Sequence, residues 1–248
     1  PAEGGEQPTP AQRAALPTPK NTPELSPTDP QQDTVVDGLL QLMGQAKKDL
    51  LIVSPYFVPG PDMKQAFAAA RARGVRVRVL TNSLASNDAP IAHAGYARHR
   101  PELLATGLEL YEMRSELSAL RSVFQGTGSS GVTGSSGDSK AMLHSKLLIV
   151  DGRLLVIGSM NLDLRSQVQG TEIALLIRSR SLSARATEQI EAALEDAAWR
   201  VEQDGEGRLV WRAPKDSGLK DATAEPDTSA PLRWLVRILG WFAPDHLL

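Results

Sequence analysis

The hydrophobic pattern of this 248-residue chain alternates between strand and helical periodicity. Residues 50–53 are all apolar, which is typical of a strand buried on both faces, whereas residues 75–80 alternate with period two. We expect Arg76 and Arg78 to reach outward from that second strand. The pattern of the first half predicts helices at 33–43, 62–73 and 90–105, and strands at 50–53, 75–80 and 108–113.

In the second half, two short apolar runs flank Asp151-Gly152, which is typical of a hairpin turn. The segments expected there are strands at 147–150, 154–157, 171–177 and 208–211, and an amphipathic helix at 181–201. We also expect Pro101 to break or restart the helix at 90–105. Strands that alternate with helices, plus one hairpin, predict an α/β sandwich with a mixed β-sheet flanked by helices.

Composition divides the chain into three parts. Eight of the 17 prolines fall within the first thirty residues, so residues 1–31 are predicted to be a disordered linker or tail. Residues 32–212 form the predicted folded domain, and residues 213–248 a polar linker followed by an amphipathic helix. A Gly/Ser-rich segment at 125–139 is either a lid at the mouth of a site or an ordinary linker.

Charge and residue usage narrow the classes of function. The absence of cysteine excludes disulfides and thiolate metal sites. A net charge of −2 gives no support to a nucleic-acid partner, because such proteins usually present a basic surface. No apolar run approaches the length of about 18 residues that a membrane-spanning helix needs, so we expect none in this chain.

His144 and Lys146 carry the clearest chemical signal. Residues two apart on a strand project from the same face, so an imidazole and an ammonium would lie side by side. A phosphodiester requires a nucleophile for its phosphorus and positive charge for its non-bridging oxygens. Ser159 and Asn161 repeat the spacing after the next strand and add neutral donors. We therefore expect Lys146, Ser159 and Asn161 to bind a substrate phosphate.

Two carboxylates complete the candidate set. Glu172 opens the next predicted strand, and a carboxylate on the far ring nitrogen of His144 would hold its tautomer. The alternative for Glu172 is a surface carboxylate on an edge strand. Asp151 lies at the hairpin turn, where it is as suited to fixing the turn as to catalysis.

The order H-x-K-x4-D followed by G-S-x-N, from His144 to Asn161, resembles the signature of the phospholipase D superfamily. The run from 142 to 166 is similar to the second motif of bacterial cardiolipin synthases. The segments that are similar to the cardiolipin synthase C type are residues 54–59, 80–88 and 93–98. The resemblance covers about residues 33–212.

This resemblance implies a phospholipase D-like fold and transfer of a phosphatidyl group through a phosphohistidine, giving cardiolipin. It implies that His144 is nucleophile or general acid, that Lys146 grips phosphate, and that Glu172 orients His144. Water as acceptor would instead make the protein a phospholipase. No cofactor and no metal are expected. The implied partners are a phospholipid and the surface of the bacterial inner (cytoplasmic) membrane, at which the protein would be peripheral.

Enzymes of this family bring two such motifs together, whereas this chain has one. His93 and His99 lack a lysine two residues later. The chain is then either the C-terminal half of a two-motif enzyme or one copy of a symmetric pair, as in the single-motif nucleases. We favour the first, because the additional motifs belong to the long enzymes. The alternatives are a homodimeric phosphodiesterase or nuclease, and a half-domain that is inactive without its partner half.

The functions of two predicted helical segments can each be interpreted in two ways. His93, Tyr96 and Arg98 either line a headgroup pocket or are ordinary residues of a helix. In the segment 231–242, Arg233 and Arg237 share a narrow polar stripe on an otherwise apolar helix. Such a helix lies either in a bilayer interface or against protein.

Overall fold

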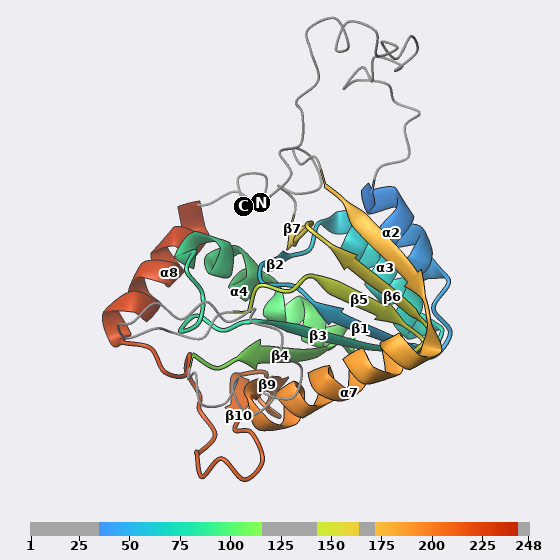
Figure 1. Cartoon of the computed structure of the whole chain (residues 1–248). Helices are drawn as coiled ribbons and strands as arrows, with labels where there is room; N and C mark the ends of the chain where they lie inside the picture. Colours follow the sequence, from blue (N-terminus) through green and yellow to red (C-terminus); the bar gives the residue numbers. More distant parts are fainter. Residues whose placement is uncertain (1–34, 116–142, 164–171, 243–248) are drawn as a thin grey trace, which may run out of the picture. The chain divides into compact units, whose positions relative to one another are not determined.

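The apolar run at residues 50–53 lies in an interior strand of an eight-stranded mixed sheet (Figure 1). In sheet order the strands are β10 (Leu209–Arg212), β9 (Ala198–Gln203), β4 (Glu109–Met113), β3 (Arg76–Asn82), β1 (Asp49–Val53), β5 (Leu147–Val150), β6 (Leu154–Gly158) and β8 (Ala174–Arg178). The pairs β1–β3 and β3–β4 are parallel and the other pairs are antiparallel.

The computed structural model describes residues 35–115, 143–163 and 172–242, which belong to one compact unit, Thr34–Leu248. The predicted tail at 1–31 and the Gly/Ser-rich segment at 125–139 lie outside the described residues.

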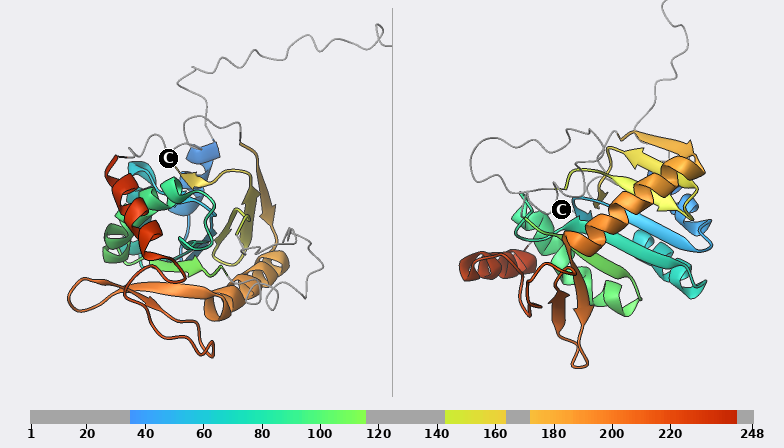
Figure 2. Two further views of the ribbon diagram at one scale, coloured as in Figure 1. Left: turned by 90° about the vertical axis from the view of Figure 1, so that its left-hand side faces the viewer. Right: turned by 60° about the horizontal axis from the view of Figure 1, so that its bottom comes forward.

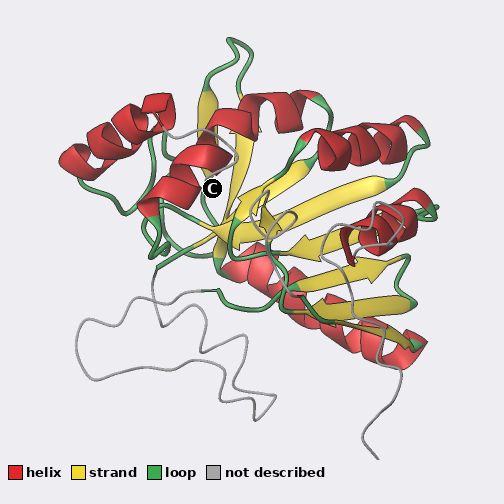
Figure 3. Cartoon of the chain, turned by 90° about the horizontal axis from the view of Figure 1, so that it is seen from above, coloured by secondary structure: helices red, strands yellow, loops and turns green. Residues whose placement is uncertain are grey.

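Helices cover both faces of the sheet (Figures 2 and 3). Those on one face are α2 (Val35–Gly44), α3 (Pro61–Ala72) and α4 (Pro90–Ala105), and α7 (Arg180–Asp196) covers the other. Leu50 and Ile52 of β1 face the first layer, whereas Leu51 and Val53 face α7. Burial on both sides explains why residues 50–53 of β1 are all apolar. The predicted mixed α/β sandwich is confirmed.

Two small elements complete the described structure. A separate two-stranded parallel sheet pairs β2 (Phe57–Val58) with β7 (Leu162–Asp163). The C-terminal helix α8 (Ala230–Phe242) packs against α4. None of the helices in the described ranges is both long enough and apolar enough to span a bilayer.

The helix predicted over 181–201 is wrong in its second part. It ends at Asp196, and the chain continues as β9, which pairs with β4 and β10. Trp199 and Val201 alternate into the same core cluster. Period-two burial, and a partner strand on each side, outweigh the helical spacing that the apolar residues also satisfy.

The expected break at Pro101 is also absent, because α4 runs without interruption from Pro90 to Ala105. The neighbouring Arg100 and Leu103 are buried, so tertiary packing holds the helix despite the hydrogen bond that proline cannot donate.

Only one of the two arginines of β3 reaches outward as expected. Arg76 is exposed and pairs with Glu109. Arg78 is buried instead, and its guanidinium bonds to Asp49 and to Glu191 of α7. A helix lying over this face supplies the carboxylate that compensates the buried charge.

Candidate active site

His144 and Lys146 lie in the extended segment that leads into β5, which itself begins at Leu147. The backbone N–H of Gly158 donates to the Lys146 carbonyl at 3.1 Å, which continues the β5–β6 ladder one residue further. His144 is exposed and Lys146 is half-buried. The Lys146 ammonium donates to the His144 carbonyl oxygen at 3.1 Å. The ammonium of Lys146 therefore lies against the backbone of His144, and the predicted pairing of its imidazole with that ammonium stays a prediction.

Asn82, at the end of β3, holds the chain just before His144. This buried amide accepts a hydrogen bond from the Leu143 N–H at 2.9 Å and donates to the Leu143 carbonyl at 3.1 Å. Its Nδ2 also donates to the Pro55 carbonyl at 3.2 Å. One side chain thus ties the segment of His144 to the loop that follows β1.

Ser159 and Glu172 form a pair that the sequence did not predict. The Ser159 hydroxyl donates to the Glu172 carboxylate and accepts a hydrogen bond from the Ile173 N–H at 3.1 Å. The expected hydrogen bond between Glu172 and His144 is therefore corrected: in this structure Glu172 is bonded to Ser159. Antiparallel pairing of β6 with β8, continued one step beyond Gly158 and Ala174, places Ser159 opposite Ile173, the residue directly after Glu172. Glu172 precedes β8, so the predicted strand at 171–177 begins later than expected.

The charge of Lys146 is set by its surroundings. Burial lowers its pKa, and the negative charges of Glu172 and Asp163 oppose that effect. The lysine therefore lies within electrostatic reach of two carboxylates at the same edge of the sheet. Such an ammonium remains available to an anionic group that approaches from solvent.

Tyr56, Asp88 and Asp163 belong to this region although the sequence analysis gave them no role. The Tyr56 hydroxyl donates to Asp88 at 2.5 Å. Burial, Asp88 and the charge of Asp163 together raise the pKa of Tyr56 to about 12. All three lie inside segments that were singled out as motifs, so the motif matches held the signal. Pairing of Val58 with Asp163 in the small sheet brings Asp163 to the segment of Tyr56, and the hydrogen bond from Tyr56 brings Asp88 there.

Asn161 contributes a buried oxygen. Its Oδ1 has no hydrogen-bond partner among the described residues. An unsatisfied buried acceptor costs about 1–3 kcal/mol, so the oxygen is suited to a donor supplied from elsewhere. The amide Nδ2 is the group of Asn161 that could donate to a phosphate oxygen.

Asp151 does not belong to the cluster. It lies at the opposite end of β5, five residues and about 16 Å of extended chain from Lys146. Its carboxylate accepts hydrogen bonds from the backbone N–H groups of Lys47, Lys48 and Asp49. Burial raises its pKa, but these bonds outweigh that effect and the pKa is lowered. These contacts favour the structural alternative for Asp151, and a catalytic role for it stays an untested prediction.

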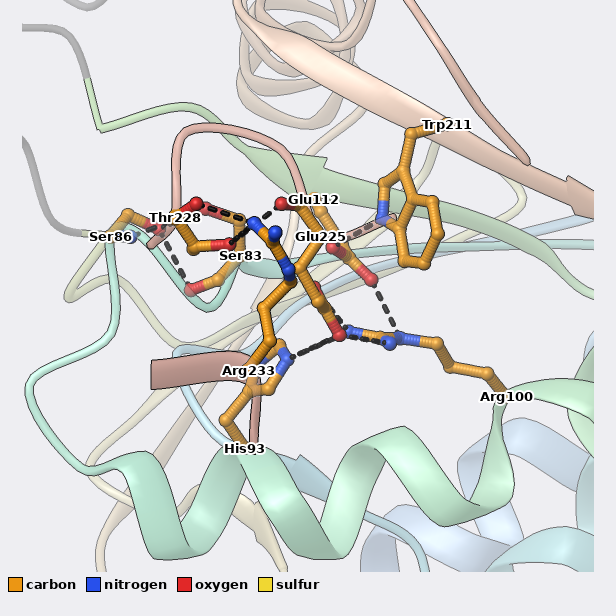
Figure 4. A network of polar contacts seen from close by, with 9 residues as sticks. All are labelled: Ser83, Ser86, His93, Arg100, Glu112, Trp211, Glu225, Thr228 and Arg233. Atoms are coloured by element: carbon orange, nitrogen blue, oxygen red, sulfur yellow. Dashed lines mark hydrogen bonds and ion pairs between the residues drawn. The ribbon is translucent and has the colours of Figure 1, made fainter. Parts of the chain in front are cut away.

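His93 and Tyr96 are buried rather than lining an open pocket. Figure 4 shows His93 within a network of polar side chains. His93 Nε2 lies 2.7 Å from Arg100 Nη2 and 3.2 Å from Glu225 Oε1. Arg100 also forms an ion pair with the fully buried Glu112 at 2.8 Å. Glu225 lies in the segment that the sequence analysis describes as a polar linker.

The chain is similar in sequence to known proteins. Residues 39–194 match a family model described as cardiolipin synthase, PLD-like domain. Cardiolipin synthase C of Escherichia coli is 38% identical over 217 residues, which cover 85% of this chain and 43% of that protein. Cardiolipin synthase A of Pectobacterium carotovorum is 30% identical over 146 residues, 59% of this chain and 24% of that one.

Among solved structures, a phosphatidylserine synthase of Haemophilus influenzae superposes with a TM-score of 0.56 at 17% identity. The match covers 86% of this chain and 43% of that one. The chain thus spans less than half the length of these relatives.

Proposed function

Because the chain belongs to the phospholipase D-like domain family of cardiolipin synthases, we propose that it supplies one half of a phosphatidyltransferase active site. The observation that carries the proposal is the exposed His144 beside the ammonium of Lys146, at an edge that also holds Ser159 and Glu172. An imidazole and a cation at one open edge are the groups that phosphodiester transfer needs.

In the proposed first step, a ring nitrogen of one histidine attacks the phosphorus of a phospholipid. The bond between phosphorus and the headgroup oxygen breaks, and a second histidine protonates that oxygen so that the headgroup leaves as an alcohol. An acceptor alcohol then attacks the phosphohistidine and gives its proton to the second histidine. His144 is one of these two histidines, either the nucleophile or the general acid.

The acceptor determines the product. The free hydroxyl of another phospholipid's glycerol headgroup would accept the phosphatidyl group and give cardiolipin. Free glycerol would instead give phosphatidylglycerol, and an ethanolamine headgroup, which has no free hydroxyl, could only be the alcohol that leaves the donor. Lys146 would neutralise the non-bridging oxygens as charge develops on them, and the Asn161 amide would donate to the same oxygens. Water as acceptor would give hydrolysis.

A second histidine must come from outside this cluster. Of the histidines that the structure describes, His93 is buried with Arg100 and Glu225, and His99 bonds to Lys64. We therefore include in the proposal a second half carrying its own motif, either elsewhere in a longer polypeptide or in a second copy.

The edge strand β8 is the surface proposed for that second half. Ile173, Leu175 and Leu176 expose 75%, 59% and 52% of their surface, directly after Glu172. Large exposed apolar side chains on an unpaired edge strand mark a protein contact or an aggregation hazard. A partner lying on β8 would place its groups next to Glu172 and Ser159.

The test of the chemistry uses the complete transferase that contains this chain and its second half. His144→Ala is expected to lower phosphatidyl transfer from phosphatidylglycerol by about 10³-fold or more. His99→Gln, a histidine outside the cluster, is the matched control and should retain the rate. Activity that survives His144→Ala would remove His144 from the mechanism.

A second experiment determines which histidine is the nucleophile and which is the general acid. Brief reaction with phospholipid labelled at phosphorus, followed by quenching, should leave label on a histidine of one half. Label on His144 makes it the nucleophile, and label on the second half makes His144 the acid. No labelled histidine in either half would contradict the phosphohistidine.

The contact through β8 is tested by association. Leu175→Ser combined with Leu176→Ser should weaken association of this chain with its second half by about tenfold. Leu182→Ser combined with Leu219→Ser changes two exposed leucines elsewhere and should leave association unchanged. Equal association of both variants would place the contact on another surface.

A further inference from the structure

Helix α8 presents apolar side chains both to the protein and to solvent. Its inner side contributes Val236, Leu232 and Leu239, which pack on Leu84 and on Ala94 of α4. Its outer side presents Trp234, Leu235 and Ile238, which are 68%, 49% and 40% exposed. Docking on the protein therefore accounts for only one of the two apolar stripes. A contiguous exposed stripe of this size on a helix indicates a binding surface.

The outer stripe is framed by positive charge. The sequence of α8 contains Arg233 and Arg237 and no acidic residue. Arg98 and Arg208 join them around a cleft of about 720 Å³ between α4, α8 and β10. Arg208 is paired with Asp204 and Glu206, so the charge directed to solvent comes chiefly from the arginines of α8. The carboxylate in this lining belongs to Glu225, which is already paired with Arg100 at 2.5 Å. The surface is therefore suited to negatively charged groups.

A network of buried polar side chains holds α8 in place. Figure 4 shows Glu225, which lies shortly before the helix, between Arg100 and His93. In the first turn Arg233 donates to the Thr228 carbonyl at 2.5 Å. Arg98 of α4 donates to the Gly240 carbonyl near the other end at 3.1 Å. The outer stripe thus belongs to a helix with a defined orientation on the domain.

This helix also lies near the end of the sheet at which His144 and Lys146 are located. Leu84, which contacts Val236, follows β3 by two residues. Asn82, the last residue of β3, holds Leu143 directly before His144. In Figure 1, α4 and α8 lie beyond the end of the sheet toward which β4 points. A surface that bound the outer side of α8 would therefore lie close to the site.

We propose that the outer side of α8, with Arg237 and the arginines of the neighbouring cleft, docks on an anionic phospholipid bilayer and holds the catalytic edge against it. A helix lying in the interface buries Trp, Leu and Ile among the acyl chains, while arginines contact the headgroups. Charge complementarity favours lipid over a protein occupant, because the helix has two cations and no acid. The binding goes beyond the proposed chemistry and uses none of its residues.

The apolar part of the proposal is tested by co-sedimentation of the full chain with vesicles of phosphatidylcholine mixed with phosphatidylglycerol. Leu235→Ser combined with Ile238→Ser is expected to lower the partition coefficient by about tenfold or more, because two apolar side chains leave the interface. Leu182→Ser combined with Leu219→Ser is the matched control and should bind like the wild type. Circular dichroism confirms that both variants are folded.

The charged part is tested with Arg237→Glu. Each arginine near an anionic surface contributes about 1 kcal/mol, so reversing the charge should weaken binding to the mixed vesicles by about tenfold. Binding to pure phosphatidylcholine should change little. Arg185→Glu, which alters an exposed arginine of α7, is the control. Added salt should weaken wild-type binding to the mixed vesicles only.

Three results would overturn the proposal. The wild type could fail to bind the mixed vesicles, the α8 pair could bind them as well as its control does, or Arg237→Glu could leave binding unchanged. If the α8 pair instead altered association with the second half and not vesicle binding, the stripe would belong to a protein interface. His144→Ala should bind vesicles normally, so loss of catalysis and loss of docking are measured separately.

Discussion

Lys146 illustrates how the charge of one residue depends on the folded chain. Burial lowers its pKa, while Glu172 and Asp163 act in the opposite direction. An ammonium with a lowered pKa is lost at a lower pH than an exposed lysine would lose it. The proposed binding of a phosphate oxygen by Lys146 should therefore weaken on the alkaline side, at a pH below the ordinary 10.5 of lysine.

We therefore expect kcat/KM of the complete transferase to fall as pH rises through the lowered pKa of Lys146. Lys146→Arg should be slower at neutral pH, because a planar guanidinium fits the contact differently. It should also lose the alkaline decline, since arginine stays charged. The measurement is a pair of pH–rate profiles. An identical alkaline limb in both proteins would assign the titration to another group.

Gly158 is required by a close approach of two backbones. A Cβ added there would lie 2.9 Å from the Ile173 carbonyl oxygen, which also accepts the Ser159 N–H. Gly158→Ala should destabilise the fold by about 1–3 kcal/mol and displace the Ser159–Glu172 pair. Denaturant unfolding measures the first effect. Gly205→Ala, where nothing lies within 4 Å, should change stability by less than about 0.5 kcal/mol.

At the scale of elements, the β5–β6 hairpin is fixed to β1 by its own turn. Asp151 and Gly152 both have positive φ, 51° and 63°, in the tight turn that the Arg153 N–H closes by donating to the Val150 carbonyl at 3.1 Å. The Asp151 carboxylate reaches across to three backbone N–H groups at residues 47–49. The family motif therefore contains a residue whose place here is at the far end of the hairpin.

The substitution Asp151→Asn distinguishes a structural role of Asp151 from a catalytic one. Asparagine tolerates positive φ but has one acceptor oxygen instead of two and no charge. We expect a loss of about 1–2 kcal/mol in the free energy of unfolding, with kcat unchanged while the protein is folded. Chemical denaturation and steady-state kinetics give the two numbers. A large fall in kcat at unchanged stability would return Asp151 to the catalytic set.

At the scale of the whole molecule, one buried network joins parts that are distant in sequence. Arg100 of α4 contacts Glu112 of β4 and Glu225 of the C-terminal segment, and Trp211 of β10 donates to Glu112 at 2.9 Å. Burial raises the pKa of Glu112. Burial acts in the same direction on Glu225, but Arg100 and His93 outweigh it and lower that pKa to about 2.

Glu225→Gln should destabilise the protein by about 3 kcal/mol at neutral pH, since the buried Arg100 loses a charged partner. A carboxyl with a folded pKa below its unfolded value of 4.5 stabilises fully above 4.5. That stability is lost as pH falls toward 2, so the gap between wild type and variant should narrow over this window. Thermal unfolding of both proteins at a series of pH values measures this difference in stability.

Glu206→Gln is the control for this prediction, because it removes an exposed ion pair with Arg208 and should cost less than about 1 kcal/mol. A constant gap between wild type and Glu225→Gln at all pH values would show that Glu225 is not ionised in the fold.

The local pattern of apolar, polar and turn residues predicted most of the helices, strands and turns of this protein. The all-apolar run of β1, the hairpin turn at Asp151-Gly152 and the spacing of His144 and Lys146 are features of neighbouring residues, so they can be read without a fold. β9 was missed because its apolar residues also fit a helix. What decides between the two is pairing with β4, about ninety residues away in sequence, where Leu110 lies opposite Val201.

The amino-acid sequence by itself determined the type of fold, the family motifs and the pair of groups suited to phosphodiester chemistry. Tertiary structure alone decided their partners: Glu172 meets Ser159, Asp151 meets residues 47–49, and Tyr56 meets Asp88. The physical reason is that periodicity and turn chemistry act over a few residues. Strand register and burial are set by contacts between segments that only the folded chain brings together.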